Sequence, residues 1–150
     1  MMTLLTSAYT SDAVIKEILE TTRVIALIGA SDKPDRPSYS VMKYLKIMGY
    51  QVIPVNPFKA GKEILGEPVF GSLSEINTPI DMVDIFRKPS ETVQIIDAAI
   101  AANAKAIWMQ IGVVNQEAAK RATAAGLQVI MNRCPKIEIP RLKIRSANKE

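Results

Sequence analysis

Five short apolar segments recur along the chain, separated by stretches whose apolar residues repeat at helical spacing. The apolar segments cover residues 24–29, 51–55, 81–86, 106–109 and 128–131. Short runs that are apolar throughout are typical of strands buried on both faces of a parallel sheet. Strands that alternate with helices place helices on both sides of such a sheet. We therefore expect an α/β fold: a Rossmann-like, doubly wound parallel sheet of about five strands in three α/β/α layers.

Capping residues and breakers mark four helices between these segments. They are expected from Ser11-Asp12 to residue 22, from Ser38 or Tyr39 to Gly49, from Pro89-Ser90 to Asn103, and from Asn115 to Ala125. Glycine and proline residues spread over 58–76 predict a loop there, with a short strand near Val69 and a helical turn at 72–76. After Cys134-Pro135 we expect a short extended segment and a tail.

The length of 150 residues suits one domain, with residues 1–10 and 142–150 as terminal extensions. The net charge of +4 suits an anionic ligand. The densest basic stretch, 141–149, is predicted to be a solvated tail, and no aromatic-rich basic strand of the RNA-binding type is present. No apolar run approaches the ~20 residues of a membrane span, and no signal-peptide pattern is present. We expect a cytoplasmic protein that contacts neither nucleic acid nor membrane.

Histidine is absent, and Cys134 is the single cysteine. These two facts exclude a Ser-His-Asp triad, the usual Cys-His pair, a phosphohistidine and an intramolecular disulfide. A metal site is not expected, and no catalytic residue is assigned. Arg133 could activate the thiol of Cys134, but a buried structural cysteine is the favoured interpretation. Trp108 lies within an apolar segment and is expected to pack in the core.

The ligand of a doubly wound sheet lies outside the carboxyl ends of its strands, where the strand order reverses. Gly29, Ala30 and Ser31 follow the first strand, and the next helix begins near Ser38 and Ser40. A glycine turn and the free N–H groups of a helix N-terminus together favour phosphate binding. A plain tight turn with a helix cap is the alternative.

The second strand lacks the features of an NAD site. The G-x-G-x-x-G pattern is missing, and Val55, Asn56, Pro57 and Lys59 stand where an acidic residue would hold a ribose hydroxyl. A lysine there suits an additional phosphate on the adenosine ribose, as in NADP or coenzyme A. At the third strand end, Arg87 could bind a pyrophosphate and Phe86 could cover an adenine. A solvated arginine and a core phenylalanine remain the alternatives.

Six segments carry a resemblance to a known family. In chain order they are IALIGASDKPDRPSYSVMKYL, GYQVIPVNP, GEPVFGSLSEI, DMVDIFRKP, AIWMQIGV and MNRCPKIE. The chain resembles stand-alone bacterial and archaeal CoA-binding domain proteins. These are similar to the N-terminal, CoA-binding domain of the succinyl-CoA synthetase α subunit. The resemblance implies a Rossmann-like sheet that binds coenzyme A or an acyl-CoA.

The resemblance also implies roles for individual residues. It assigns the phosphates to Gly29, Ala30, Ser31 and Ser40, the adenosine and its 3′-phosphate to Val55, Asn56, Pro57 and Lys59, the adenine or pyrophosphate side to Phe86 and Arg87, and the pantetheine arm to Gly112, Asn132, Arg133 and Cys134. Without a histidine to carry phosphate, a complete ligase cycle is excluded. We therefore expect a CoA-binding carrier, sensor or partner module without a reaction of its own. A small NADP-linked oxidoreductase is the alternative. Homodimerisation and an unidentified protein partner both stay open.

Overall fold

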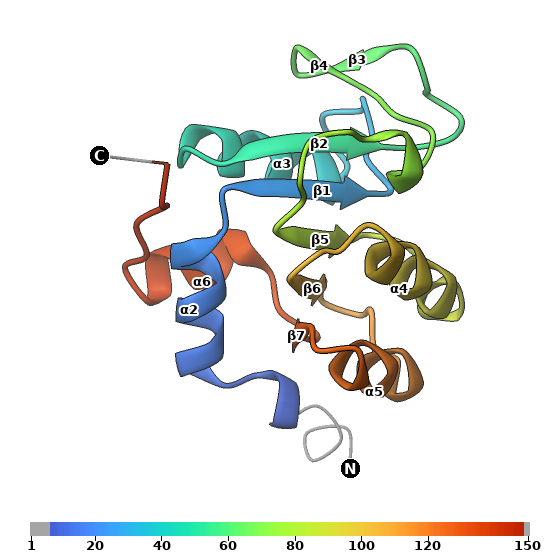
Figure 1. Cartoon of the computed structure of the whole chain (residues 1–150). Helices are drawn as coiled ribbons and strands as arrows, with labels where there is room; N and C mark the ends of the chain where they lie inside the picture. Colours follow the sequence, from blue (N-terminus) through green and yellow to red (C-terminus); the bar gives the residue numbers. More distant parts are fainter. Residues whose placement is uncertain (1–6, 149–150) are drawn as a thin grey trace.

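The computed structural model describes residues 7–148, and a five-stranded parallel sheet forms its centre (Figure 1). The strands are β1 (Val24–Ile28), β2 (Gln51–Val55), β5 (Met82–Ile85), β6 (Ala106–Met109) and β7 (Gln128–Ile130). Their order across the sheet is β2-β1-β5-β6-β7, and all neighbouring strands are parallel. The predicted Rossmann-like sheet is therefore confirmed. The chain adds β2 on one side of β1 and then β5, β6 and β7 on the other side, which places the switch point between β1 and β5.

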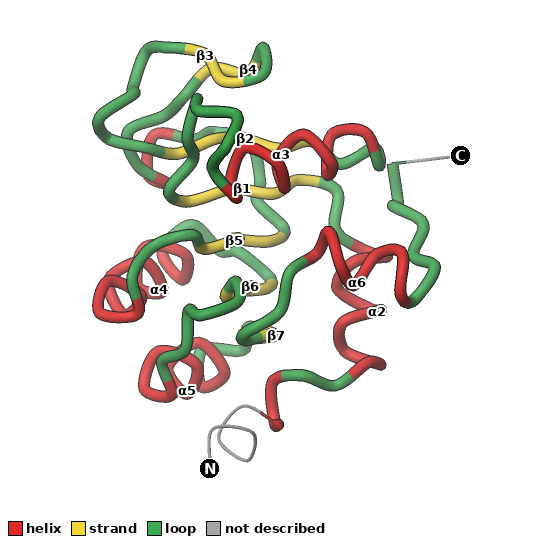
Figure 2. Tube along the Cα trace, turned by 180° about the vertical axis from the view of Figure 1, so that it is seen from behind, coloured by secondary structure: helices red, strands yellow, loops and turns green. Residues whose placement is uncertain are grey.

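Helices cover both faces of the sheet, which confirms the three predicted layers. The α-helices are α2 (Asp12–Thr21), α3 (Pro37–Ile47), α4 (Thr92–Ala101), α5 (Gln116–Ala124) and α6 (Pro135–Arg141). Short 3-10 turns are η1 (Ser7–Tyr9), η2 (Leu73–Glu75) and η3 (Pro89–Glu91). Helices α4 and α5 lie on one face, and α2, α3 and α6 lie on the other (Figures 1 and 2). None of these helices is long and apolar enough to cross a membrane within residues 7–148.

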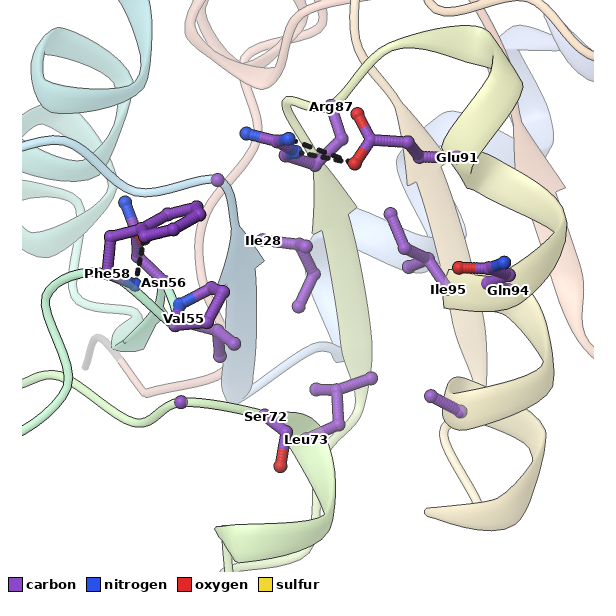
Figure 3. A pocket seen from close by; sticks show the side chains of 14 residues that line it. Ile28, Val55, Asn56, Phe58, Ser72, Leu73, Arg87, Glu91, Gln94 and Ile95 are labelled. Carbon is purple, nitrogen blue, oxygen red and sulfur yellow. Dashed lines mark hydrogen bonds and ion pairs between the residues drawn. The ribbon is translucent and has the colours of Figure 1, made fainter.

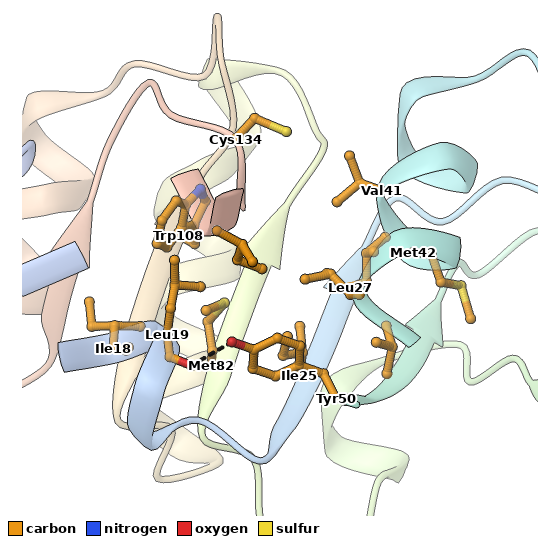
Figure 4. Packing of buried hydrophobic residues seen from close by; sticks show 14 of the residues in the cluster. Ile18, Leu19, Ile25, Leu27, Val41, Met42, Tyr50, Met82, Trp108 and Cys134 are labelled. Carbon is orange, nitrogen blue, oxygen red and sulfur yellow. Dashed lines mark hydrogen bonds between the residues drawn. The ribbon is translucent and has the colours of Figure 1, made fainter. Parts of the chain in front are cut away.

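The two faces of the sheet carry separate apolar cores. On β1, Ile25 and Leu27 pack toward α2, α3 and α6, whereas Ala26 and Ile28 pack toward α4. This alternation explains why the strands are apolar throughout, because neither face meets water. Trp108 is fully buried in the core on the side of α2, α3 and α6, as predicted (Figure 4). Its Nε1 donates to the carbonyl of Arg133 at 2.8 Å.

The predicted helix starts are largely confirmed. The hydroxyl of Ser11 accepts a hydrogen bond from the Val14 amide, and the side chain of Asn115 accepts one from Ala118. Both residues therefore act as N-caps. Helix α3 begins at Pro37, one residue earlier than predicted, and its N-cap residue Arg36 makes no side-chain cap. Proline is favoured at this position because no intrahelical N–H is needed there.

The segment after Cys134 forms helix α6, so the prediction of an extended segment is wrong. Pro135 starts the helix, and Ile139 is buried beneath it. The Arg141 guanidinium lies 2.6 Å from the carboxylates of both Glu138 and Asp12, which ties α6 to α2. Proline is disfavoured in helix interiors, so Pro140 concealed this helix in the sequence.

The described part of the basic stretch 141–149 packs against the domain instead of standing free in solvent as predicted. Ile144 and Ser146 are buried. The side-chain Nδ2 of Asn148 donates to the backbone carbonyl of Arg23 at 2.9 Å, and the guanidinium of Arg23 donates to Oδ1 of Asn148 at 3.2 Å. The proposed limits of the terminal extensions remain a prediction.

The segment between β2 and β5 contains a small hairpin beyond the edge of the main sheet (Figure 2). Its strands are β3 (Glu63–Ile64) and β4 (Glu67–Pro68), whereas the sequence predicted one short strand near Val69. The turn places Leu65 and Gly66 at φ +50° and +81°, the geometry of a tight hairpin turn. The turn was missed because leucine rarely adopts positive φ. The predicted helical turn at 72–76 is confirmed as η2.

Candidate ligand-binding site at the switch point

Two cavities open side by side at the carboxyl ends of β1, β2 and β5. Their volumes are about 440 and 420 Å³. Three residues line both cavities and form the ridge between them: Gly29, Asn56 and Arg87. The ridge therefore combines the residues that follow these three strands, at the place where doubly wound sheets hold their ligands.

The larger cavity is mainly apolar (Figure 3). Apolar lining residues come from the ends of β1 and β2, from η2 and from one face of α4: Ile28, Val55, Pro57, Phe58, Leu73, Ile95 and Ala98. Polar groups at its edges are contributed by Ser72, Glu91 and Gln94. A cavity with apolar walls and a few polar edge groups suits a flat, largely apolar ring system.

The second cavity is cationic. Four basic residues line it: Lys33, Arg36, Lys59 and Arg87. Pro37 and Ser38, the first residues of α3, also line it, so the positive end of the helix dipole faces the same space. Two of the cations have acidic neighbours: Lys59 lies 3.5 Å from Asp32, and Arg87 lies 2.9 Å from Glu91. This cavity can hold phosphate groups.

Gly29 lets the end of β5 pass close to the turn after β1. Its φ is +88°, and a Cβ atom at this position would lie 2.9 Å from Cδ of Arg87 and 3.1 Å from the carbonyl oxygen of Phe86. The amides of Gly29 and Ala30 both donate to the carbonyl of Val55, at 3.0 and 3.3 Å. These two N–H groups thus fix the turn to β2, and donors for a ligand come from Ser31, α3 and the basic side chains.

Asn56 connects the loops that follow β1 and β2. Its Nδ2 donates to the carbonyl of Ala30 at 2.8 Å, and its Oδ1 accepts from the amide of Phe58 at 2.9 Å. One side chain therefore fixes the relative position of the two loops that carry the ridge.

Replacing Asn56 with alanine is expected to destabilise the fold by about 1–2 kcal/mol, because both hydrogen bonds are lost. Ligand affinity should fall with it, since the loops are no longer held together. Urea unfolding measures the first effect. Asn77→Ala, at an exposed asparagine, is the control and should change stability by less than about 0.5 kcal/mol. Equal stability of the two variants would contradict the connecting role of Asn56.

The predicted site residues fall into two groups. The first group lines one or both cavities: Gly29, Ala30, Ser31, Ser38, Val55, Asn56, Pro57, Lys59, Phe86 and Arg87. The second group lines neither cavity: Ser40, Gly112, Asn132, Arg133 and Cys134. The role of the second group toward a ligand stays a prediction.

Residues of the second group have partners of their own. The hydroxyl of Ser40 accepts a hydrogen bond from Nζ of Lys136 at 2.6 Å. Beyond β6 and β7, Oδ1 of Asn132 accepts from the amide of Gly112 at 2.8 Å, and the Arg133 guanidinium donates to the carbonyl of Asn132. Cys134 has a free thiol and belongs to the core on the α6 side, as its favoured structural interpretation predicted.

Several lining residues were missed in the sequence. Lys33 and Arg36 precede a helix, and Phe58 follows a strand end. Each stands beside a proline, so the sequence already indicated that all three lie in loops at the edge of the sheet where the ligand was expected. Gln94, Ile95 and Ala98 offered none, because only the packing of α4 beside η2 brings them to the cavity.

Asp84 is a fully buried carboxyl group on β5. With the amide of Gln110 oriented to pair with it, the nitrogen lies 2.8 Å from Oδ1 and 3.2 Å from Oδ2. Burial raises the pKa of Asp84 well above its usual range. The carboxyl lines neither cavity, so it supports the carboxyl end of β5 and is not assigned to the site.

The parallel sheet, whose strand order reverses at β1, and the two cavities at its carboxyl edge define a Rossmann-like ligand-binding domain. The chain belongs to the CoA binding domain family, whose sequence model matches residues 23–140. The match covers all five strands of the sheet and both cavities.

Three known proteins are similar to this chain in sequence or in fold. The uncharacterized protein YneT of Bacillus subtilis is 41% identical over 127 residues, which cover 85% of this chain and 93% of YneT. A solved structure of a hypothetical protein from Pyrococcus horikoshii superposes with a TM-score of 0.84 at 44% identity, covering 89% of this chain and 92% of that one. A dinucleotide-forming acetyl-coenzyme A synthetase of Korarchaeum cryptofilum shares the fold, with a TM-score of 0.65 at 22% identity over 77% of this chain and 26% of that one.

Proposed function

We propose that this protein binds coenzyme A or an acyl-CoA and acts as a carrier, sensor or partner module without a reaction of its own. The observation that carries the proposal is the pairing of an apolar and a cationic cavity across one ridge at the switch point. Coenzyme A joins an adenine to a pyrophosphate and a ribose 3′-phosphate, so it has one part for each cavity. Membership of the CoA binding domain family supports the same ligand.

The proposed pose follows the chemistry of the walls. The adenine occupies the apolar cavity, and the pyrophosphate lies in the cationic cavity near Ser31, Ser38 and Arg87. Lys59 meets the 3′-phosphate. The pantetheine arm leaves along the carboxyl ends of β6 and β7, past Gly112 and residues 132–134.

Phosphate binding in this pose must rearrange two ion pairs. Asp32 and Glu91 neutralise Lys59 and Arg87, and both pairs are partly exposed. Exposed pairs of this kind contribute little stability, at most ~1 kcal/mol each. A phosphate can therefore replace the carboxylate as the partner of either cation with little loss of free energy.

Titration calorimetry with coenzyme A, dephospho-CoA, NADP and NAD tests the proposal. Coenzyme A should bind most tightly, and dephospho-CoA should bind about tenfold more weakly, because one charge-assisted hydrogen-bonding group is lost. In Lys59→Ala the difference between these two ligands should disappear. Lys62→Ala, at an exposed lysine that lines neither cavity, should preserve it.

Two results would contradict the proposal. The first is no binding of coenzyme A at millimolar concentration. The second is tighter binding of NADP than of coenzyme A, which would favour the NADP-linked oxidoreductase instead.

A further inference from the structure

Phe58 is the most exposed large apolar side chain in the part of the chain that the structure describes. Its exposed fraction is 84%, although it stands at the rim of the apolar cavity. A phenylalanine that contacts mainly water gains little from folding, whereas a partner that covers its ring gains apolar contact area. The position of Phe58 therefore points to a ligand group that covers the ring.

The backbone that carries Phe58 is held rigidly. The residue before it is Pro57, its amide donates to Oδ1 of Asn56 at 2.9 Å, and the amide of Lys59 donates to the Asn56 carbonyl at 3.1 Å. Only the side-chain torsions of Phe58 remain free. Ligand binding therefore has to order only these side-chain torsions and not the backbone, which limits its entropic cost.

The wall opposite Phe58 is apolar and open. Ile95 and Ala98 lie three residues apart on α4 and face the cavity, and Figure 3 shows Phe58 and Ile95 on opposite sides of it. The small side chain of Ala98 leaves room between the walls. A ring that enters this cavity therefore meets apolar side chains on the Phe58 side and on the α4 side.

We propose that the ring of Phe58 stacks on the adenine of the bound nucleotide and sets the affinity of the site for its adenosine end. This inference rests on the proposed function, because it names the residue that recognises the base in the same site. Stacking is tolerant of ring substituents, so Phe58 contributes affinity for a base rather than a choice among bases.

Three variants and two probes test the stacking. The probes are adenosine 3′,5′-bisphosphate, which carries the base, and 4′-phosphopantetheine, which does not. In Phe58→Ala the affinity for coenzyme A and for the bisphosphate should fall about tenfold, and that for phosphopantetheine should not change. Phe58→Leu should lie between alanine and the parent. Phe58→Trp should bind at least as tightly as the parent.

The tryptophan variant also gives a direct readout. The parent contains only Trp108, which is fully buried, so its fluorescence supplies a constant background. The added tryptophan at position 58 should be quenched when the bisphosphate binds, and phosphopantetheine should leave it unchanged. Ile47→Ala removes another exposed apolar side chain that lines neither cavity, and should alter no affinity.

The outcomes separate the two proposals. The stacking is overturned if Phe58→Ala binds coenzyme A as tightly as the parent does, or if the bisphosphate does not quench the tryptophan at position 58. Either result leaves the proposed function standing. A parent that binds no coenzyme A overturns the proposed function itself. Because Phe58 is exposed, the free energy of unfolding of its variants should lie within about 0.5 kcal/mol of the parent's value. Urea unfolding measures this.

Discussion

Replacing Gly29 with alanine is expected to destabilise the protein by about 2–5 kcal/mol and to abolish ligand binding. A left-handed backbone costs an alanine about 1–2 kcal/mol. The new Cβ would also overlap Arg87 and the Phe86 carbonyl, at 2.9 and 3.1 Å, and such overpacking adds about 1–3 kcal/mol. To relieve the overlap, the Arg87 side chain must turn away and the Phe86 carbonyl at the end of β5 must shift by a few tenths of an ångström, which disturbs the ridge.

Gly126→Ala is the matched control for this prediction. Gly126 has nearly the same φ, +90°, but nothing lies within 4 Å of the position that a Cβ atom would take there. It should therefore show only the conformational cost, about 1–2 kcal/mol, and keep the ligand site intact. Urea unfolding and ligand titration of both variants measure the difference. Equal losses of stability and of ligand affinity in the two variants would mean that the close approach of β5 to Gly29 contributes to neither.

The second large effect is expected at Asp84, where asparagine should make the protein increasingly stable relative to the parent as the pH rises. In the folded protein, burial raises the pKa of Asp84, whereas an unfolded chain has an aspartate pKa of about 3.9. Between these two pKa values the folded state holds one proton more than the unfolded state. The stability of the parent therefore falls as pH rises through that window.

Asparagine does not titrate, so the stability difference between Asp84→Asn and the parent should grow in favour of the variant by about 1.4 kcal/mol per pH unit within the window. Urea unfolding of both proteins at pH 5, 6, 7 and 8 measures it. Asp97→Asn, at an exposed aspartate paired with Arg121, is the charge control and should change stability by no more than ~1 kcal/mol at any of these pH values. Parallel curves for Asp84→Asn and the parent would show that the buried carboxyl has no linked proton.

The sequence predicted the sheet well, because burial on both faces makes each strand apolar from end to end. Ser11 and Asn115 indicated their helices through capping, which is a local interaction. Helix α6 was hidden because Pro140 argues against a helix, and because the ion pair of Arg141 with Asp12 joins residues far apart in the chain. The hairpin β3–β4 depends on Leu65 at positive φ and on Lys46, whose Nζ lies 2.7 Å from Glu67. Neither the backbone conformation of Leu65 nor the ion pair leaves a recognisable pattern in the local sequence.

The site was predictable where it follows strand ends and hidden where it depends on packing. Gly29, Asn56 and Arg87 each directly follow or lie near the end of a strand, so topology alone placed them together. The sequence did not indicate that the backbone N–H groups of Gly29 and Ala30 donate hydrogen bonds to the carbonyl of Val55 and are therefore not free to bind a phosphate. It also gave no sign that α4 supplies one wall of the apolar cavity, since the residues of that wall differ little from other helix residues.

The shared ridge of Gly29, Asn56 and Arg87 has a consequence for how binding energy is gained. Two fragments that fill one cavity each can occupy the protein together, and each alone makes few contacts and binds weakly. A molecule that joins both fragments across the ridge turns the second contact into an intramolecular event, with an effective concentration in the millimolar range for a short flexible connection. The connection must also be long enough to cross the ridge, so its length becomes a further criterion by which the site selects ligands.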